Sequence, residues 1–539
     1  MRLAAVVVLL VVFAARMVDT AREKTFTLDE PHYLGTGLYL WATGDYHFAR
    51  SLRFHPPLAF HLASLLLLGI DRPEPLTPAV GGDLIRGGAE DVERIRLLSR
   101  VPFIAVACWG GLLVYLFGAT LGGGAAGLTG LVLYTSSPLV LGYGPLAHSD
   151  LLVSVLFLQT AFAFWWWRHR GRSEVAFAAT GVSLGLALAA KATGLLLLPA
   201  LGGLLLWDRC TGQPVARRHR ISAGRLVEVV GRLGFLVALA LGMLWLAYGG
   251  SFAVSGGLPG PYEDLRLPGY LHALAFDAAA NAQGRPIYFA GKVVERGQWY
   301  HLPVAYVLKA SPGMLLLLLL AAGLLLVRRA PAIPELLVPA AIHLAVALFW
   351  LEVPLGVRYL LPALPLLLVT TAVAVTRRPR WRLVAGAAAL FVVADAIAAH
   401  PHYLAHGNEL AGGSAGLRRY VAESNLDWGQ DAKTLARFLA RQGNPPVALA
   451  FVGPEPPSRY GARTTPLVGC DAVPGWVAIS VNVHVGLYDP SNPFRRPPRG
   501  CYRWLAHRRL AGQPGYSVLV FAPDSEGGAR HALPGAPPR

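Results

Sequence analysis

Long apolar runs separated by short polar turns dominate the first three quarters of the chain. One of them, Gly313 to Val327 (GMLLLLLLAAGLLLV), joins flanking apolar residues to reach the roughly 20 residues that a helix needs to cross a bilayer. Helices are expected because a backbone exposed to lipid has to satisfy its own hydrogen bonds. The runs predict about eleven crossings, near 3–20, 97–118, 125–143, 151–167, 174–190, 192–207, 233–250, 304–327, 334–351, 359–376 and 383–399.

The distribution of charge supports this topology. The chain has 539 residues, a formal net charge of +17 and a mean hydropathy of +0.46. Such a charge could suggest nucleic-acid binding, but the Lys and Arg residues lie in short clusters between apolar runs, which indicates membrane orientation instead. If the first helix enters from the cytoplasm, crossing parity places the strongest clusters (165–172, 209–225, 327–330 and 376–382) on the cytoplasmic side. We therefore expect a multi-pass protein of the cell inner membrane with no nucleic-acid partner.

The N-terminal run, Met1 to Ala21, has a second interpretation. Its apolar core is short and small residues follow it, so it could be a cleaved secretory signal. We favour an uncleaved first helix. Under that topology two long loops, 21–96 and 251–301, lie outside, and residues 1–400 form the transmembrane domain. The apolar run Leu58 to Ile70 is too short to cross and is expected to lie in the interface as an amphipathic helix.

The tail, residues 401–539, lacks the spanning pattern. It contains a helix signal (DAKTLARFLARQ) and short strand-like runs (VALAFV, WVAISVNV and YSVLVF), which predict a small extracytoplasmic α/β domain with a disordered end at 527–539. Cys470 and Cys501 both fall in this tail. They are expected to form a disulfide if the tail is in an oxidising compartment, and two free thiols are the alternative.

Acidic residues at the external ends of spans are candidates for chemistry, because carboxylates near a membrane are costly to desolvate. Asp29 and Glu30 follow the first span, and Asp150 begins the fourth span on the same side. The structural alternative is helix capping, since an acidic residue suits a helix N-terminus.

External basic residues depart from the usual charge bias. Lys191, Lys309 and Arg358 each lie where they can reach an anionic headgroup at the outer face, and Arg offers a two-pronged match to a phosphate. Snorkelling to ordinary lipid headgroups is the structural alternative.

Several stretches of the chain together resemble bacterial glycosyltransferases that use a phospholipid carrier. These enzymes are related to the protein O-mannosyltransferases and the lipid A aminoarabinose transferase of the glycosyltransferase C superfamily. The likeness extends from Asp29 to about Leu439, and the Asp-Glu pair and DWGQD are its more specific parts. It is carried by DEPHYLGTGLYLWATGDY, HPPL, HSDLLVSVLF, KATGLLLLP, GQWYHLPVAYVLKASPG, RYLLPALPLL, HPHYLAHGNELAGG and SNLDWGQDAKTLARFL.

The resemblance implies a glycosyltransferase C fold and transfer of a sugar, with inversion, from a polyprenyl phosphate at the outer face to a glycan, lipid or protein acceptor. It implies that Asp29 is the catalytic base, that Glu30 shapes the loop and that Asp150 is a second acid. The aminoarabinose transferases carry Arg and Lys at the positions of His32 and His55, and neutral His is the weaker anion partner. The expected substrate-binding residues are His32, Tyr33, His55, Lys191, Lys309, Arg358 and Tyr359.

No cofactor is required by this interpretation, and a divalent metal ion near Asp29 and Asp150 is kept open. A metal site in the His-rich segment HPHYLAH with Glu409 is disfavoured, because aromatic residues often replace these histidines in the family. A transporter or flippase of a lipid-linked glycan is the main alternative function. Transporters usually place charges near the midplane and often show repeated halves, whereas here the charges lie at external span ends and no repeat is evident.

Overall fold

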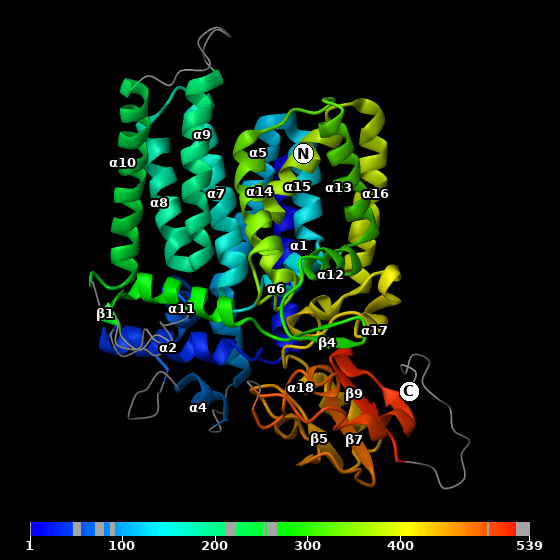
Figure 1. Cartoon of the computed structure of the whole chain (residues 1–539). Helices are drawn as coiled ribbons and strands as arrows, with labels where there is room; N and C mark the ends of the chain where they lie inside the picture. The colour runs from blue at the N-terminus through cyan, green and yellow to red at the C-terminus, as the bar shows by residue number, and fades with distance from the viewer. Residues whose placement is uncertain are drawn as a thin grey trace.

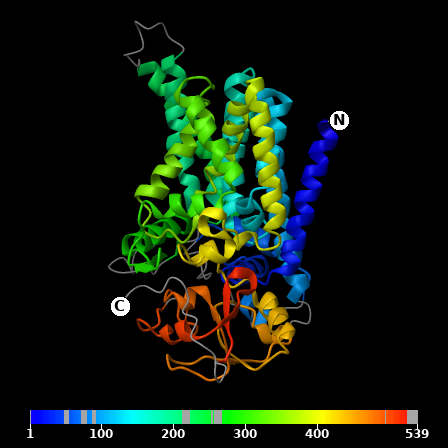
Figure 2. The same ribbon diagram turned by 90° about the vertical axis from the view of Figure 1, so that its right-hand side faces the viewer.

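The computed structural model has an upright helical bundle and a smaller unit that packs against one end of it (Figure 1). It describes residues 2–46, 55–70, 80–86, 92–211, 223–251, 254–255, 267–492 and 495–523. The view turned by 90° shows the smaller unit below the bundle again and α1 standing along its side (Figure 2). The predicted disordered end and most of the basic loop 209–225 lie outside the described residues.

The bundle consists of helices at the predicted crossings. They are α1 (Arg2–Glu23), α5 (Val92–Thr135), α7 (Ser149–His169), α8 (Glu174–Ala190), α9 (Leu197–Thr211), α10 (Ala223–Ala247), α13 (Pro312–Leu326), α14 (Pro334–Phe349), α15 (Leu364–Thr376) and α16 (Pro379–Ala398). Five described helical segments, in α1, α5, α7, α10 and α16, are long and apolar enough to span a membrane, and the remainder are shorter apolar helices. The chain is therefore a multi-pass helical membrane protein, while the number of crossings stays a prediction.

Two expected spans differ from a simple helix. The spans 97–118 and 125–143 lie within one long element, α5 and the following α6 (Pro138–Tyr143), and α5 is broken at Gly123 by a φ of 78°. The span 304–327 is divided into α12 (His301–Lys309) and α13, because Pro312 starts the second helix and Ser311 before it is extended.

Close helix packing depends on small residues, as expected where lipid removes most of the hydrophobic drive for helices to associate. On α8, Gly185 contacts α10 so closely that an added Cβ would lie 2.6 Å from the Cβ of Met243 and 2.8 Å from the Cα of Ala240. Gly181, one turn earlier, lies against Leu239 in the same way. α15 packs against α5, α13 and α14, and nearly all of its residues are buried.

Shorter helices lie across the end of the bundle that faces the tail unit (Figure 1). The first long loop, 21–96, forms α2 (Glu30–Thr43), α3 (Leu58–Ser64) and α4 (Val80–Arg86). The second, 251–301, forms α11 (Gly269–Gln283) and two antiparallel strand pairs, β1 (Val254–Ser255) with β2 (Leu267–Pro268) and β3 (Ile287–Phe289) with β4 (Lys292–Val294). The run Leu58 to Ile70 thus holds a short helix, α3, that buries Phe60, and the turn after it exposes Leu65 and Leu66. Its place in the membrane interface stays a prediction.

The tail unit is built on a five-stranded mixed sheet in the order β6-β5-β7-β9-β8. Its strands are β5 (Val447–Ala450), β6 (Thr464–Pro466), β7 (Trp476–Ser480), β8 (Leu510–Gly512) and β9 (Val518–Phe521); its helices are α17 (Gly413–Leu417), α18 (Ala432–Arg441) and α19 (Val481–His484). β5 is parallel to β6 and β7, whereas β9 is antiparallel to β7 and β8. Leu435 and Leu439 of α18 are buried in the core of this unit.

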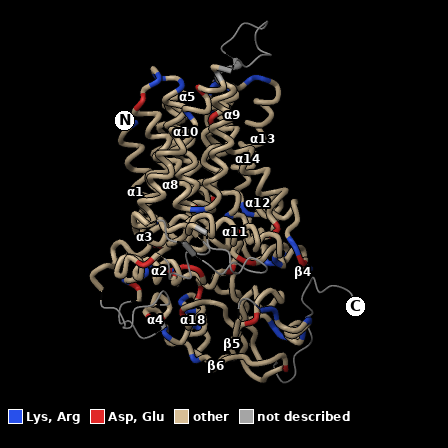
Figure 3. The backbone as a smooth tube through the Cα atoms, turned by 60° about the vertical axis from the view of Figure 1, so that its left-hand side comes forward, with Lys and Arg blue, Asp and Glu red and all other residues tan. Residues whose placement is uncertain are grey.

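The disulfide between Cys470 and Cys501 is present, which confirms the predicted pairing over two free thiols. Lys and Arg residues gather at the bundle end away from the tail unit, as well as within that unit (Figure 3). The bundle is therefore asymmetric in charge along its length, as the positive-inside pattern predicts, although the side of the membrane stays a prediction.

Candidate active site

Asp29 is the residue before the first turn of α2, and its side chain does not cap that helix. Its carboxylate instead faces His148 and Arg358, with Oδ2 lying 3.6 Å from His148 Nε2 and 3.7 Å from Arg358 Nη1. The side chain is 38% exposed. Burial opposes ionisation of Asp29, but His148 and the charge of Arg358 outweigh it and hold its pKa below its usual value. Asp29 is thus an accessible, ionised carboxylate.

Asp150 lies in the first turn of α7 and is deeply buried, with its side chain only 4% exposed. Its Oδ1 accepts a hydrogen bond of 2.5 Å from Lys191, and its Oδ2 lies 3.0 Å from His148 Nδ1 and 3.5 Å from Arg358 Nη1. Asp150 therefore joins the two predicted cations. We call Asp29, His148, Asp150, Lys191 and Arg358 the ion cluster.

Arg358 is the centre of the ion cluster. It lies in a short turn, Val357–Leu360, that leads into α15. Its guanidinium carbon is 4.3 Å from the ring centroid of Trp428 and 5.6 Å from that of Tyr359. The buried Nε has no hydrogen-bond partner among the described residues. A buried guanidinium with an unused donor is well suited to an anion.

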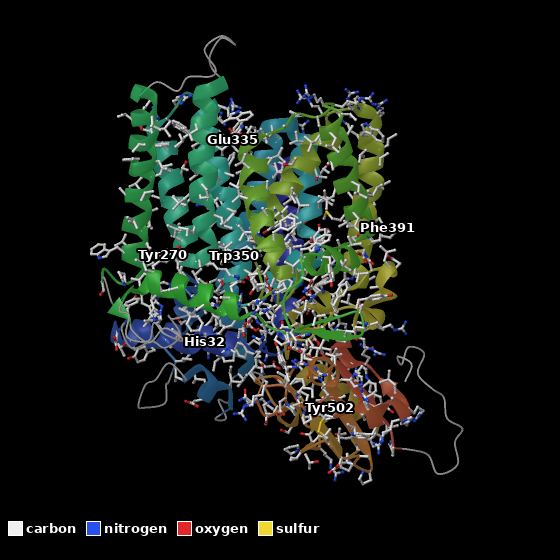
Figure 4. The ribbon with its side chains drawn as sticks, viewed as in Figure 1. His32, Tyr270, Glu335, Trp350, Phe391 and Tyr502 are labelled. Carbon is white, nitrogen blue, oxygen red and sulfur yellow. A yellow bond between two sulfur atoms is a disulfide. The ribbon has the colours of Figure 1, made fainter. Side chains whose placement is uncertain are left out.

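Aromatic and histidine rings from the first long loop form one wall beside the ion cluster. Tyr33 Oη lies 3.3 Å from His148 Nε2 and 3.2 Å from Ser149 Oγ, while His55 stacks on the Tyr33 ring at 5.8 Å between centroids. His32, labelled in Figure 4, contacts the edge of Phe60 from the start of α2. Burial lowers the pKa of both His32 and His55, so both rings are neutral near pH 7.

Glu30 has no access to solvent. Its carboxylate accepts two hydrogen bonds from Arg100 and one each from the backbone N–H groups of Thr27 and Ala147. It thereby ties α2, α5 and the turn before α7 together. The resemblance assigns the role of base to one acid of the pair and shaping of the loop to the other. The burial of Glu30 in an ion pair fits shaping of the loop.

Lys309 is not brought together with the other candidates. Its ammonium is buried and donates to the carbonyl oxygens of Leu404, His406 and Asn425, which uses all three of its hydrogens. Lys191, by contrast, lies in the ion cluster, with its Nζ 5.0 Å from the Tyr359 ring centroid. The cations of the site are thus Lys191 and Arg358.

Three residues of the site were not predicted from the sequence: His148, Arg100 and Trp428. His148 lies two residues before Asp150, in HSDLLVSVLF, and Trp428 lies within DWGQD, so both belong to motifs that carry the resemblance. Arg100 lies four residues after Arg96 at the start of a predicted span. Two arginines that share one helix face at the start of an apolar run need buried acidic partners. This spacing could therefore have predicted buried ion pairs.

The His-rich segment does not converge on one point. His400 contacts Asp19, His402 contacts Lys24, and His406 lies near Asp395. Within the described residues, no group of three or more His, Cys, Asp or Glu side chains is arranged to hold a metal ion.

No family model matches the chain, and no curated protein matches it by sequence. Solved structures do. The apo structure of ArnT from Cupriavidus metallidurans matches at a TM-score of 0.50 and 13% identity over 96% of this chain and 97% of that one. A structure of the same protein bound to undecaprenyl phosphate gives 0.49 and 13% over 98% and 99%. The apo Archaeoglobus fulgidus oligosaccharyltransferase gives 0.42 and 14% over 80% and 58%.

At 13% identity, the match to the apo ArnT structure shows the fold alone. The chain is similar to ArnT from end to end. The resemblance stated from the motifs is therefore confirmed at the level of the fold.

Proposed function

We propose that this protein is an inverting glycosyltransferase that moves a sugar from a polyprenyl-phosphate carrier to an acceptor at the outer face of the membrane. The observation that carries the proposal is the pairing of Asp29 with Arg358. An open, ionised carboxylate that caps no helix lies beside a buried guanidinium with an unused donor. The fold and the motif resemblance support the same class of enzyme.

Inverting transfer needs a base for the acceptor and a cation for the leaving group. In the proposed reaction the acceptor hydroxyl gives its proton to Asp29 as its oxygen bonds to the anomeric carbon. The bond between that carbon and the phosphate oxygen breaks, and its electrons go to the carrier phosphate. Arg358 and Lys191 stabilise the negative charge that develops there. A single displacement of this kind inverts the anomeric centre.

Donor binding has a consequence for the strength of the base. Arg358 contributes to keeping the pKa of Asp29 low in the free protein. A phosphate at Arg358 would neutralise part of that positive charge and place a negative charge nearby, and both effects raise the pKa of a carboxylate. Asp29 would then be a better base with donor bound than without it, which disfavours chemistry before the donor is in place.

His32, His55, Tyr33 and Tyr359 are proposed to contact the carrier phosphate or the sugar as neutral partners. Asp150 is proposed to position the two cations, since Lys191, His148 and Arg358 all converge on its carboxylate. A divalent ion near Asp29 and Asp150 is proposed only as an addition to Lys191 and Arg358. Activity with and without a chelator tests it.

The test is a donor panel. Purified protein in lipid nanodiscs receives polyprenyl phosphates carrying hexoses, pentoses or an aminopentose, with membrane glycolipid as acceptor, and free carrier phosphate is measured with and without EDTA. Release of free carrier phosphate from at least one donor, only when the acceptor is present, supports the proposal. Movement of intact lipid-linked sugar across proteoliposomes without release from any donor would support a flippase instead.

A further inference from the structure

The tail unit reaches the active site through the loop Asp427–Asp431, here called the DWGQD loop. The backbone immediately before Asp29 runs alongside this loop. Thr25 N–H donates to the carbonyl of Gln430 and Leu28 N–H to that of Trp428, both at 2.9 Å. The segment that delivers Asp29 is thus bonded through its main chain to residues about 400 positions later in the sequence.

Buried charges reinforce this contact. Lys24 donates to Asp431 at 2.5 Å, and the two side chains are only 6% and 0% exposed. Asp431 also accepts from Ser517 Oγ at 2.7 Å, just before β9. Phe26 N–H donates to Glu455, whose carboxylate is paired with the buried Arg96. Removing one member of such a buried pair strongly destabilises the protein, because the other charge stays buried without a partner.

The same loop supports the cationic side of the site. The Trp428 ring, 5% exposed, lies under the Arg358 guanidinium at 4.3 Å and against the His148 ring at 5.2 Å. The loop itself is fixed from the tail side, because Asn482 N–H donates to the Asp427 carboxylate at 3.0 Å and Asn482 Nδ2 donates to the Asp427 carbonyl at 2.8 Å. One loop therefore contacts both Arg358 and the segment that carries Asp29.

We propose that the tail unit is a structural part of the active site, in which the DWGQD loop sets the position of Asp29 relative to Arg358. Trp428 is the positioning residue for Arg358, and the Lys24 and Asp431 pair anchors the segment that carries Asp29. The kinetic part of this inference rests on the proposed function, whereas its structural part does not. In Figure 4, nitrogen and oxygen atoms crowd the level where the bundle and the tail unit meet.

The anchor is tested by hydrogen exchange on the full chain in nanodiscs. Asp431→Asn removes the charge while keeping the size, and the amides of residues 24–33 are expected to exchange about 10- to 100-fold faster through local opening. The matched control is Arg496→Ala, because Arg496 also joins the tail unit to the loop that holds β4, through Glu295, but at a more exposed pair away from residues 24–33. If Asp431→Asn fails to fold, Lys24→Met serves. Unchanged exchange at 24–33 in the folded variant would overturn the anchor.

The positioning role is tested by kinetics. Trp428→Leu is expected to raise the KM for donor about 2- to 30-fold, in line with loss of a cation–π contact, with a smaller effect on kcat and recovery in Trp428→Phe. Trp504→Leu is the control, since Trp504 contacts Arg508 in the same manner elsewhere in the tail unit. An unchanged donor KM in Trp428→Leu would overturn the role.

These outcomes separate the two proposals. If the parent protein transfers no sugar, the proposed function fails, and polyprenyl phosphate alone is used as the binding probe for the Trp428 variants. The exchange experiment needs no activity at all. A parent that is active, with tail-loop variants indistinguishable from it in both experiments, would leave the function standing and overturn this inference.

Discussion

Arg100 donates two hydrogen bonds to Glu30, of 2.8 Å from Nε to Oε1 and 2.7 Å from Nη2 to Oε2, and both side chains are buried. Burial opposes ionisation of Glu30, but the charge of Arg100 outweighs it and holds its pKa below its ordinary value. Because Glu30 directly follows Asp29, this pair fixes the candidate base relative to α5. The two acids of the motif thus lie in different environments, because Glu30 is buried in an ion pair and Asp29 is partly exposed beside Arg358.

Glu30→Gln is expected to destabilise the protein by about 3–5 kcal/mol, because it leaves the Arg100 charge buried without its partner. Thermal unfolding in detergent measures the change. The control is Glu228→Gln, since Glu228 forms an exposed pair with Arg232 that should contribute about 0–1 kcal/mol. Equal stability of Glu30→Gln and the parent would show that the pair does not hold the loop.

Arg358→Ala is expected to weaken binding of polyprenyl phosphate by about 1.5–3 kcal/mol, the usual size of a hydrogen bond to a charged group. Arg358→Lys should recover only part of the affinity, because an ammonium lacks the planar fork. Equilibrium binding of the carrier measures both. Arg496→Ala, which breaks an exposed pair with Glu295, is the control. Unchanged affinity in folded Arg358→Ala would make the residue a lipid anchor.

The raised pKa of the buried Asp427 carboxyl predicts that the stability of the protein depends on pH. Burial raises its pKa from 3.8 to about 7, with Asp431 and Glu423 adding to the rise and backbone hydrogen bonds opposing it. Between these values the folded chain keeps a proton that the unfolded chain has lost, so this group makes the protein less stable as the pH rises from 4 to 7.

Asp427→Asn cannot titrate and should lack this dependence. Melting curves of variant and parent, taken across that window, should therefore show the parent losing stability relative to the variant as pH rises. Groups that do not interact with Asp427 titrate equally in both proteins, so they cancel in the comparison. A difference that stays constant with pH would mean that Asp427 keeps an ordinary pKa.

The Cys470 and Cys501 disulfide closes a loop with a sequence separation of 31. Loss of the bond should cost the tail unit about 3–4 kcal/mol in the chain-entropy account. Mass spectrometry should find both cysteines resistant to alkylation until a reductant is added. Alkylation of either one in the unfolded, unreduced protein would contradict the bond.

Local pattern was enough to predict the helices of the bundle, because most of them are encoded in one continuous apolar run. The strand-like runs of the tail were visible for the same reason. What the pattern did not reveal was the contact between segments far apart, such as Thr25 with Gln430. Lys309 illustrates the limit: its place beside external loops predicted a phosphate contact, yet three carbonyls from residues 404–425 surround its ammonium.

The site was predictable in its acids and less so in its partners. Asp29 and Asp150 were found because charge at a span end is costly. Arg100 and His148 were not, since only the folded chain shows that one neutralises Glu30 and the other bridges the two aspartates. His32 and His55 were expected as weak anion partners, and that role stays a prediction.

The central claim is that Asp29 is the general base of a lipid-carrier glycosyltransferase, and single-turnover transfer by Asp29→Asn tests it most directly. The isosteric amide keeps the shape but cannot take the acceptor proton, so the rate should fall about 10²- to 10⁴-fold while carrier binding is kept. Asp45→Asn, at the other end of α2, is the matched control and should transfer at the parent rate. A folded Asp29→Asn protein that binds donor and transfers sugar at the parent rate would contradict the claim.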